Sequence, residues 1–315
     1  MNDRNKERVL PGTMCLVLTL CWLGVGSLVA QEPPITDLAF SPDGKTLISC
    51  SQRGLRVFSW PELQLQKEIS AFADNLHCLS FSPNEDLLAV GGGNPSEDGS
   101  VAIYAWPSFA PKFNLSSSKD SVVAFAWRNE SQLIAASLDR TLVLWDLETQ
   151  SAVQTFSGHS RGVTAACVLE PGEIVSAGHD QSVRVWSAES GELIRSMNQH
   201  SKPIHAIAAC PNATGRPLIA TASRDRSIRF WQPTIGRMMR YVRLESEPLD
   251  IAWIDEKQLL AGCIDGQVRV VDFENVSVSR AIPAIQGWAY AVAIHPSDGS
   301  FAAGGSDGQI FRIDL

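Results

Sequence analysis

The sequence lacks several of the short motifs that mark catalytic and nucleotide-binding sites. It contains no H-E-x-x-H, no P-loop and no G-x-G-x-x-G. The glycine run at residues 91–93 precedes no predicted helix, so it does not resemble a phosphate-binding turn. None of the six histidines stands at a metal-ligand spacing from another histidine or a carboxylate on a predicted helix. We therefore predict no catalytic residue, no metal site and no cofactor.

The sequence also lacks an excess of positive charge. Its 26 Lys and Arg are outnumbered by 34 Asp and Glu, which gives a formal net charge of −8. Proteins that bind nucleic acid broadly need a basic surface for the phosphate backbone, so the predicted partners do not include nucleic acid. The contents of hydrophobic residues (44%) and charged residues (19%) are those of a globular protein.

Cysteine is sparse after residue 30, where only Cys50, Cys78, Cys167, Cys210 and Cys263 occur. An odd number cannot pair completely, and the spacing matches neither a metal motif nor a disulfide scaffold. All five lie in or beside predicted strands, so we expect small, buried, apolar side chains. A bridge between Cys50 and Cys78 is the alternative in an oxidising compartment.

The sequence has one long hydrophobic run, at residues 14–30. Three basic residues precede this uncharged run, and small residues end it. The arrangement predicts a signal peptide, residues 1–30, that is cleaved after Ala30. An uncleaved membrane anchor formed by residues 14–30 is one alternative, because 17 residues are near the lower limit of about 17–25 for a spanning helix. A cytosolic N-terminal tail is the other.

This prediction divides the chain into a leader and one domain. Residues 31–315 would be the mature protein, located in the periplasm or secreted. The membrane would be a partner only if the leader were retained.

One short pattern recurs seven times after residue 50. At residues 180–186 it reads DQSVRVW: an acidic turn residue, alternating aliphatic residues on one face of a strand, and a closing aromatic residue. The closing residues are Phe58, Tyr104, Trp145, Trp186, Trp231, Val271 and Ile313, at steps of 46, 41, 41, 45, 40 and 42. A period of about 40–45 residues is typical of four-stranded propeller blades. The sequence therefore predicts an all-β, seven-bladed propeller.

The turns between the predicted strands carry two further features. Asp recurs in the same turn of six blades, at positions 98, 139, 180, 225, 265 and 307, and this recurrence indicates that each Asp serves its own turn. Residues 91–100 form a Gly-rich insertion, which we expect to lengthen a loop in blade two.

Blades four and five resemble the WD40 repeat family. The matching residues are His159, Ser176, Asp180 and Trp186 in blade four, and His200, Thr221, Asp225 and Trp231 in blade five. The resemblance implies a hydrogen-bonded network in which the histidine joins the carboxylate to the hydroxyl, and the hydroxyl meets the indole N–H. It further implies a platform that docks protein partners across its narrower top face, without catalysis. The other five blades lack the histidine, so we expect apolar packing to hold them.

The seventh blade presents a topological problem. The sequence ends two residues after the predicted third strand of this blade. In WD40 proteins the N-terminal segment supplies the outer strand, and here the corresponding residues, 22–30, belong to the hydrophobic leader. We predict a seventh blade of three strands, whose open edge a partner completes. Pairing of residues 22–30 with residues 309–313 would contradict this hypothesis.

The candidate partner-binding residues are basic or aromatic residues of the top-face loops: Arg53, Arg140, Arg161, His179, Lys202, Arg224, Arg226, Trp288 and Tyr290. If the ring closes, several of these cations converge on one rim and meet an acidic partner. Trp288 beside such a rim has the chemistry of a binding hot spot, although it could instead pack against a neighbouring blade. We therefore predict a non-catalytic, exported interaction scaffold. The alternatives are a membrane-tethered scaffold and a secreted lyase or hydrolase, whose perturbed titratable residues would converge in the central channel.

Overall fold

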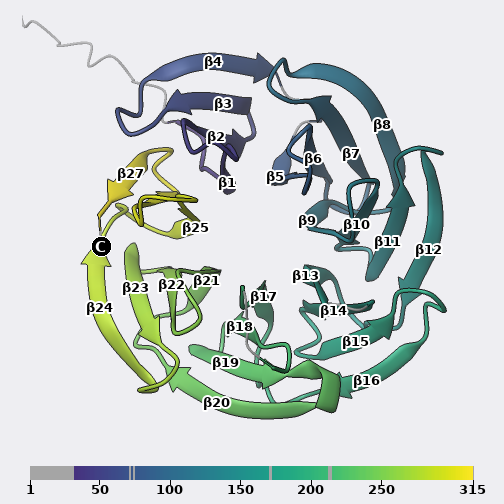
Figure 1. Ribbon diagram of the computed structural model, residues 1–315, viewed down its shortest axis with the longest axis vertical. Coiled ribbons are helices and arrows are strands. Elements are labelled where there is room, and N and C mark those ends of the chain that lie inside the picture. Colours follow the sequence, from purple (N-terminus) through teal and green to yellow (C-terminus); the bar gives the residue numbers. More distant parts are fainter. Residues whose placement is uncertain (1–31, 71, 74, 170–171, 212–214, 315) are drawn as a thin grey trace, which may run out of the picture. The chain divides into compact units, whose positions relative to one another are not determined.

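The sequence repeat becomes a ring of antiparallel β-sheets in the computed structural model of the protein (Figure 1). The structure describes residues 32–314 except 71, 74, 170–171 and 212–214. The predicted leader, its cleavage and the pairing of residues 22–30 therefore lie outside the described residues.

The second strands, and the third strands of the first six blades, are largely buried on both faces because each sheet lies between two others, whereas the outer strands are mostly exposed. In β15 (Val183–Ser187), Val183 and Val185 pack towards blade five, whereas Trp186 packs towards blade three. All three side chains are at most 1% exposed. Branched and aromatic residues fit such pleated surfaces, and the period of two along a strand sends successive side chains to opposite neighbours.

Each blade is built from strands in chain order, from the centre of the ring outwards. The inner strands are β1 (Asp37–Phe40), β5 (Leu76–Phe81), β9 (Val122–Trp127), β13 (Val163–Leu169), β17 (Ile204–Ala209), β21 (Pro248–Trp253) and β25 (Ala289–Ile294). The second strands are β2 (Thr46–Ser51), β6 (Leu87–Asn94), β10 (Gln132–Ser137), β14 (Glu173–Gly178), β18 (Ile219–Ser223), β22 (Gln258–Cys263) and β26 (Phe301–Gly305). The third strands are β3 (Gly54–Ser59), β7 (Asp98–Ala105), β11 (Thr141–Asp146), β15, β19 (Ser227–Gln232), β23 (Gln267–Asp272) and β27 (Ile310–Ile313). The outer strands are β4 (Leu65–Ser70), β8 (Ala110–Ser118), β12 (Ser151–Ser157), β16 (Leu193–Met197), β20 (Arg237–Arg243) and β24 (Ser277–Pro283).

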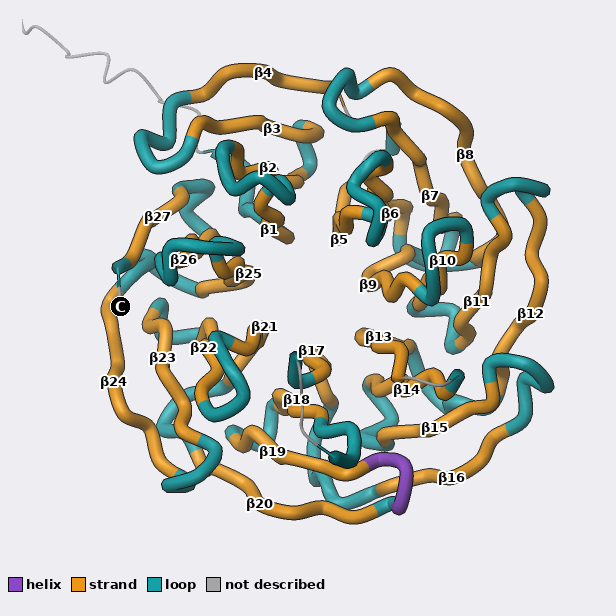
Figure 2. The backbone as a smooth tube through the Cα atoms, viewed as in Figure 1, coloured by secondary structure: helices purple, strands orange, loops and turns teal. Residues whose placement is uncertain are grey.

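The prediction of an all-β, seven-bladed propeller is confirmed. Six sheets have four strands, and the seventh, β25-β26-β27, has three within the described residues. One short helical turn, η1 (Pro233–Ile235), joins β19 to β20 (Figure 2). Across the described part of the chain, no helix combines the length and apolarity that crossing a membrane requires.

The hydrophobic core is divided among the interfaces between neighbouring blades. One buried cluster lies at each interface, and the cluster between blades seven and one contains Leu38, Phe40 and Ala291. The backbone N–H of Ile35 also donates to the carbonyl of Gly305 at 3.0 Å. Burial of apolar surface therefore closes the ring in the same way as it joins the other blades.

The Gly-rich insertion at residues 91–100 differs from the expected loop. β6 and β7 continue through most of it, and Asn94 pairs with Asp98 at the end of a longer hairpin. The small side chains permit this, because a Cβ at Gly92 or Gly99 would lie within 2.4 Å of a backbone oxygen.

The described cysteines are all free thiols, and all except the partly exposed Cys210 are buried. The alternative of a bridge between Cys50 and Cys78 is wrong. Cys50 lies 3.2 Å from the hydroxyl of Thr36, whereas Cys78 faces the carbonyl of Val122 in blade three.

Candidate protein-binding surface

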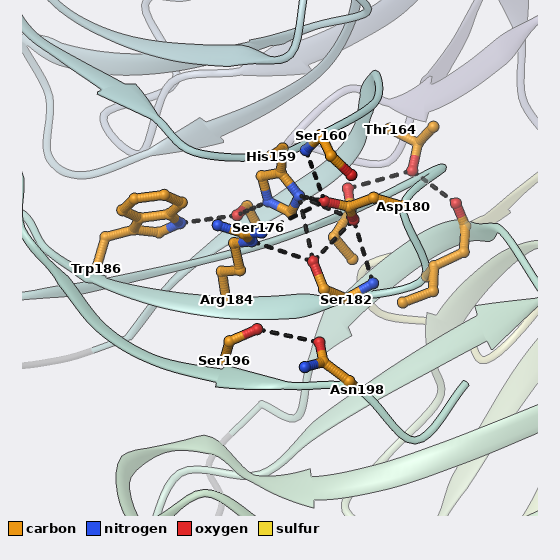
Figure 3. A network of polar contacts seen from close by, with 12 residues as sticks. His159, Ser160, Thr164, Ser176, Asp180, Ser182, Arg184, Trp186, Ser196 and Asn198 are labelled. Carbon is orange, nitrogen blue, oxygen red and sulfur yellow. Dashed lines mark hydrogen bonds and ion pairs between the residues drawn. The ribbon is translucent and has the colours of Figure 1, made fainter. Parts of the chain in front are cut away.

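A closed hydrogen-bond network occupies blade four (Figure 3). His159 Nδ1 lies 2.9 Å from Asp180 Oδ2, and its Nε2 lies 2.7 Å from Ser176 Oγ. The indole N–H of Trp186 donates to the same hydroxyl at 2.8 Å. Because the carboxylate accepts from Nδ1, the hydroxyl of Ser176 donates to Nε2 and accepts from the indole. Every polar atom of these buried rings thus has a partner.

Blade five repeats the arrangement with a threonine. His200 lies 2.9 Å from Asp225 Oδ2 through Nδ1 and 2.7 Å from Thr221 Oγ1 through Nε2. The indole N–H of Trp231 donates to Thr221 Oγ1 at 2.9 Å.

The two aspartates also hold the lead-in loops, which are the segments that enter each blade on the top face. Asp180 accepts the backbone N–H of Ser160 at 3.0 Å, and Asp225 accepts that of Ser201 at 3.2 Å. Burial alone would raise the pKa of Asp180, but hydrogen bonds from His159, from Ser182 and from the backbone N–H of Ser160 hold that pKa far below its usual range. Each carboxylate is therefore ionised and positions the residue that follows in the loop.

In blades three and seven, which lack the histidine, the Asp at the same turn position also contacts the lead-in loop. Asp139 accepts the backbone N–H of Lys119 at 3.0 Å, and Asp307 lies 3.4 Å from that of Gln286. In blade six, Asp265 instead pairs with the buried Arg269 through contacts of 2.9 and 2.6 Å. As predicted, each of the six recurring acids also serves its own turn, because its side chain accepts a backbone N–H of that turn.

The lead-in loops and turns of blades four to six surround a groove on the top face. Its volume is about 740 Å³. The lining residues are Arg161, Gln181, Lys202, Pro203, Arg224, Arg226, Glu245, Ser246, Glu247 and Ile264. The structure thus brings four predicted cations together, and we call this site the basic groove.

Two other predicted cations lie outside the basic groove. Arg53, in blade one, pairs with Glu32 at 2.8 Å. Arg140 lies in the turn of blade three with a φ of 80° and is exposed. The cations therefore gather over two blades and do not form a complete rim.

The basic groove adjoins the mouth of the central channel. Glu247 accepts from His205 Nε2 at 2.8 Å, and Arg224 Nε lies 3.6 Å from its other oxygen. Burial lowers the pKa of His179, and the neighbouring His205 and Arg161 lower it further, although Asp180 opposes the shift. His179, one of the candidate partner-binding residues, thus lies within the electrostatic field of the basic groove.

The channel contains two carboxylates that sequence reasoning missed. Asp37 and Asp250 line a cavity of about 270 Å³ between the inner strands. Burial raises the pKa of Asp37 to about 7, with a contribution from the charge of Asp250, and burial raises the pKa of Asp250 to about 6. Each occupies the same position in its inner strand, and an alignment of the inner strands with one another could have found the pair.

Backbone donors already occupy both of these carboxylates. Asp37 accepts from Leu38 N at 2.8 Å and from Leu79 N of the next blade at 2.8 Å. Asp250 likewise accepts from its own strand and from Val292 N of blade seven at 2.9 Å. The carboxylates therefore join neighbouring inner strands.

Trp288 and Tyr290 lie side by side near the channel mouth. Their ring centroids are 5.7 Å apart in an edge-to-face arrangement. Trp288 is 49% exposed, whereas Tyr290 lines the channel and burial raises its pKa. Of the pair, only Trp288 presents a large aromatic surface to solvent.

The chain contains two G-x-S-x-G sequences, at residues 158–162 and 304–308. A nucleophile elbow places its serine between a strand and a helix. Neither segment leads into a helix, and Ser306 accepts the N–H of Trp288 at 2.9 Å. Within the described residues, His, Cys, Asp and Glu side chains also form no cluster suited to a metal ion.

Comparison with known proteins adds relatives of part of the chain. The SEC12-like protein 2 of Arabidopsis thaliana is 23% identical over 155 residues, which are 45% of this chain and 38% of that protein. WD repeat-containing protein 1 of Bos taurus is 27% identical over 128 residues, 39% of this chain and 20% of that protein. Telomerase Cajal body protein 1 of Mus musculus is 30% identical over 119 residues, 35% of this chain and 22% of that protein. The chain thus spans well under half the length of these relatives.

The match to a family extends over nearly the whole propeller. The sequence model described as IFT122 first beta-propeller matches residues 34–312. Together with the seven-bladed ring and the networks of blades four and five, this match places the protein among WD40-type propellers. The chain belongs to the family of the IFT122 first beta-propeller.

Proposed function

We propose that this protein is a non-catalytic scaffold that docks another protein on the basic groove of its top face. The observation that carries the proposal is the convergence of Arg161, Lys202, Arg224 and Arg226 on a chain whose net charge is −8. Clustered charge of the sign opposite to that of the rest of the surface steers and orients a partner. The networks around Asp180 and Asp225 support the proposal, because they hold the loops that carry the groove.

Charge reversal in the basic groove tests this role. The variant combines Arg161→Glu, Arg224→Glu and Arg226→Glu. Its matched control reverses three exposed arginines of the outer strands β20 and β24, namely Arg237, Arg243 and Arg280. Quantitative cross-linking in the protein's own cells should show partners that the wild type and the control share and the groove variant loses. Identical partner sets for all three proteins would refute docking at the groove.

We further propose that the protein acts outside the cytoplasm, secreted or periplasmic, after cleavage of residues 1–30. The support is the uncharged run at residues 14–30 behind a basic segment. Intact mass measured on separate soluble and membrane fractions tests the proposal. A mass lacking about thirty residues in the soluble exported fraction is the expected result. A full-length protein in the membrane would instead make it a tethered scaffold, and a full-length cytosolic protein would contradict export.

A further inference from the structure

The free cations of the basic groove define the charge that a partner must bring. Glu247 is already shared between His205 and Arg224. Among the described residues, no carboxylate lies within ion-pair distance of Arg161, Lys202 or Arg226. The four cations of the lining outnumber its two carboxylates, Glu245 and Glu247, and this net positive charge around one concave site favours an anionic occupant.

The size of the basic groove indicates how the negative charge of its occupant is distributed. The cations come from three segments: the lead-in loop of blade four, the lead-in loop of blade five and the turn between β18 and β19. A groove of about 740 Å³ exceeds the space that one anionic group fills, and falls within the range of about 300–1,000 Å³ for sites that hold larger ligands. Several carboxylates along an extended chain match this layout better than a single charged group.

The far end of the groove leads towards Trp288. Ile264 forms that end, and it belongs to the turn between β22 and β23. A Cβ at Gly266 in the same turn would lie 2.6 Å from the carbonyl oxygen of Gly287, the residue before Trp288. An extended segment that leaves the groove over blade six therefore reaches the lead-in loop of blade seven.

Trp288 is held in a fixed position even though its ring is exposed. Its backbone N–H donates to Ser306 Oγ at 2.9 Å, and its ring packs against Tyr290. A fixed aromatic surface that is 49% exposed can cover an apolar side chain with little loss of entropy.

We propose that the partner contributes an extended segment rich in Asp and Glu, whose carboxylates lie in the basic groove and whose neighbouring apolar residue packs on Trp288. This inference rests on the proposed docking function and specifies the chemistry of the occupant. The acidic and apolar parts bind at adjacent places on the top face, so recognition requires both parts in one continuous segment.

Fluorescence anisotropy with labelled peptides tests the chemistry directly. The probe alternates Glu and Gly and carries Leu at one end; a second peptide has Gln for every Glu, and a third has Ser for Leu. We expect the Glu probe to bind, the Gln peptide to bind at least about tenfold more weakly, and added salt to weaken the Glu probe. Equal affinity of the Glu and Gln peptides would overturn the proposal. Tighter binding of a phosphoserine peptide of equal charge, by more than about tenfold, would overturn the assignment to carboxylates.

Variants locate the binding site of the probe. Arg161→Glu and Arg226→Glu should each weaken the Glu probe by about tenfold, whereas Arg243→Glu on β20 should change it by less than about twofold. Trp288→Ala should weaken the Leu probe about tenfold and leave the Ser peptide unchanged, which is the signature of a direct pair in a double-mutant cycle. An equal loss for both peptides would remove Trp288 from the proposal. Thermal melting of each variant checks that it is folded.

The cellular cross-linking and the peptide-binding experiments can fail independently, so together they distinguish the acidic segment from the docking function itself. If charge reversal in the groove abolishes a cellular partner but the Glu probe does not bind, docking stands and the acidic segment is wrong. If the probe binds at the groove but no partner depends on it, the docking function fails.

Discussion

At the scale of single residues, buried network side chains contribute far more to stability than exposed cations of the top face. Trp186 is 1% exposed and its indole N–H has one partner, Ser176. Arg161 is exposed and has no ion pair among the described residues. A residue can thus be important for binding and nearly neutral for folding.

The variants Trp186→Ala and Arg161→Ala test this difference in their contributions to stability. Loss of the indole leaves a cavity and removes a donor from Ser176, so Trp186→Ala should lower the free energy of unfolding by about 3–5 kcal/mol. Arg161→Ala should stay within about 0.5 kcal/mol of the wild type. Urea denaturation of both variants measures the difference, and equal shifts would refute the structural role of the network.

Asp37 should give the stability a dependence on pH. The pKa of Asp37 is about 7 in the folded protein, above the ordinary value of 3.8, so the folded state binds more protons between these values. Stability should therefore fall as the pH rises from about 4 to about 7. The lowered pKa values of Asp180 and Asp225 act in the opposite direction, and only below about pH 4.

Asp37→Asn isolates this contribution, because the amide does not titrate. The amide also replaces one acceptor oxygen with a donor that faces a backbone N–H, so the variant should be less stable than the wild type at low pH, and its stability should fall less steeply between about pH 4 and about pH 7 in denaturation curves. Glu97→Gln, in the exposed turn after β6, is the control and should keep the wild-type fall. Parallel pH profiles for Asp37→Asn and the wild type would contradict the raised pKa.

At the scale of the blade, blades four and six carry an arginine at the same position of the third strand, four residues after the Asp of the turn, but this arginine makes different contacts in the two blades. Arg184 in β15 lies 3.6 Å from Asp180, whose carboxylate also binds His159. Arg269 in β23 is 3% exposed, and it supplies the side-chain partner of Asp265 in a blade without the histidine. An ion pair thus occupies the place of the histidine network in blade six.

Alanine substitution at the two matched positions should reveal this exchange. Arg269→Ala removes a buried group and leaves Asp265 without its cation, so we expect a loss of about 2–3 kcal/mol, discounted for the partial exposure of Asp265. Arg184→Ala should cost about 1 kcal/mol or less, because the histidine still holds Asp180. Urea denaturation under identical conditions measures both, and an equal cost would show that Arg269 has no special role.

The three-stranded seventh sheet predicts a difference in hydrogen exchange. Within the described residues β27 pairs only with β26, so its outward amides should be exposed to water where no further segment covers them. The amides of β27 should exchange faster than those of β23, which lies between β22 and β24. Equal protection would show that another segment covers the edge of β27.

At the scale of the whole molecule, stability depends on closing the ring between blades seven and one. His295 Nε2 donates to the carbonyl of Gly44 at 3.0 Å, and the ring of His295 packs edge-to-face against Phe40. Gly44 has a φ of 70°, and a Cβ there would lie 2.4 Å from His295 Nε2. A side chain at position 44 would therefore displace the His295 ring from its contacts with Gly44 and Phe40.

Two glycine variants separate closure from backbone strain. Gly299 has a φ of 74°, but a Cβ there would meet no atom within 4 Å. Gly299→Ala should thus cost only the left-handed penalty of about 1–2 kcal/mol, whereas Gly44→Ala should cost more because His295 must also move. Thermal and urea denaturation measure the difference between them. An equal cost would mean that the contact with His295 does not support the ring.

The sequence predicts the networks of blades four and five, but it does not predict the channel carboxylates or the β6–β7 hairpin, for physical reasons. The networks of blades four and five were expected from the resemblance to WD40 repeats, which the sequence could reveal because each network contains residues of one blade and its lead-in loop. Asp37 and Asp250 escaped notice because their second hydrogen bonds reach N–H groups of the next blade, 42 residues later in each case. The glycines of the β6–β7 hairpin predict a loop because glycine disfavours strands in general, but here the backbone oxygens of Asn75 and Asp120, in the segments that enter blades two and three, approach too closely for a side chain.

The sequence by itself determined the number of blades and their strand order, because period and alternation are local properties of the chain, and the resemblance of blades four and five to WD40 repeats implied the closed networks. The tertiary structure alone decided which surface cations act together. Arg161 and Arg226 are 65 positions apart in the sequence, yet they line one groove, whereas Arg53 is neutralised by Glu32. Closure of the ring sets these distances, since it brings the loops of successive blades to one face and leaves each charge with the neighbours that the ring provides.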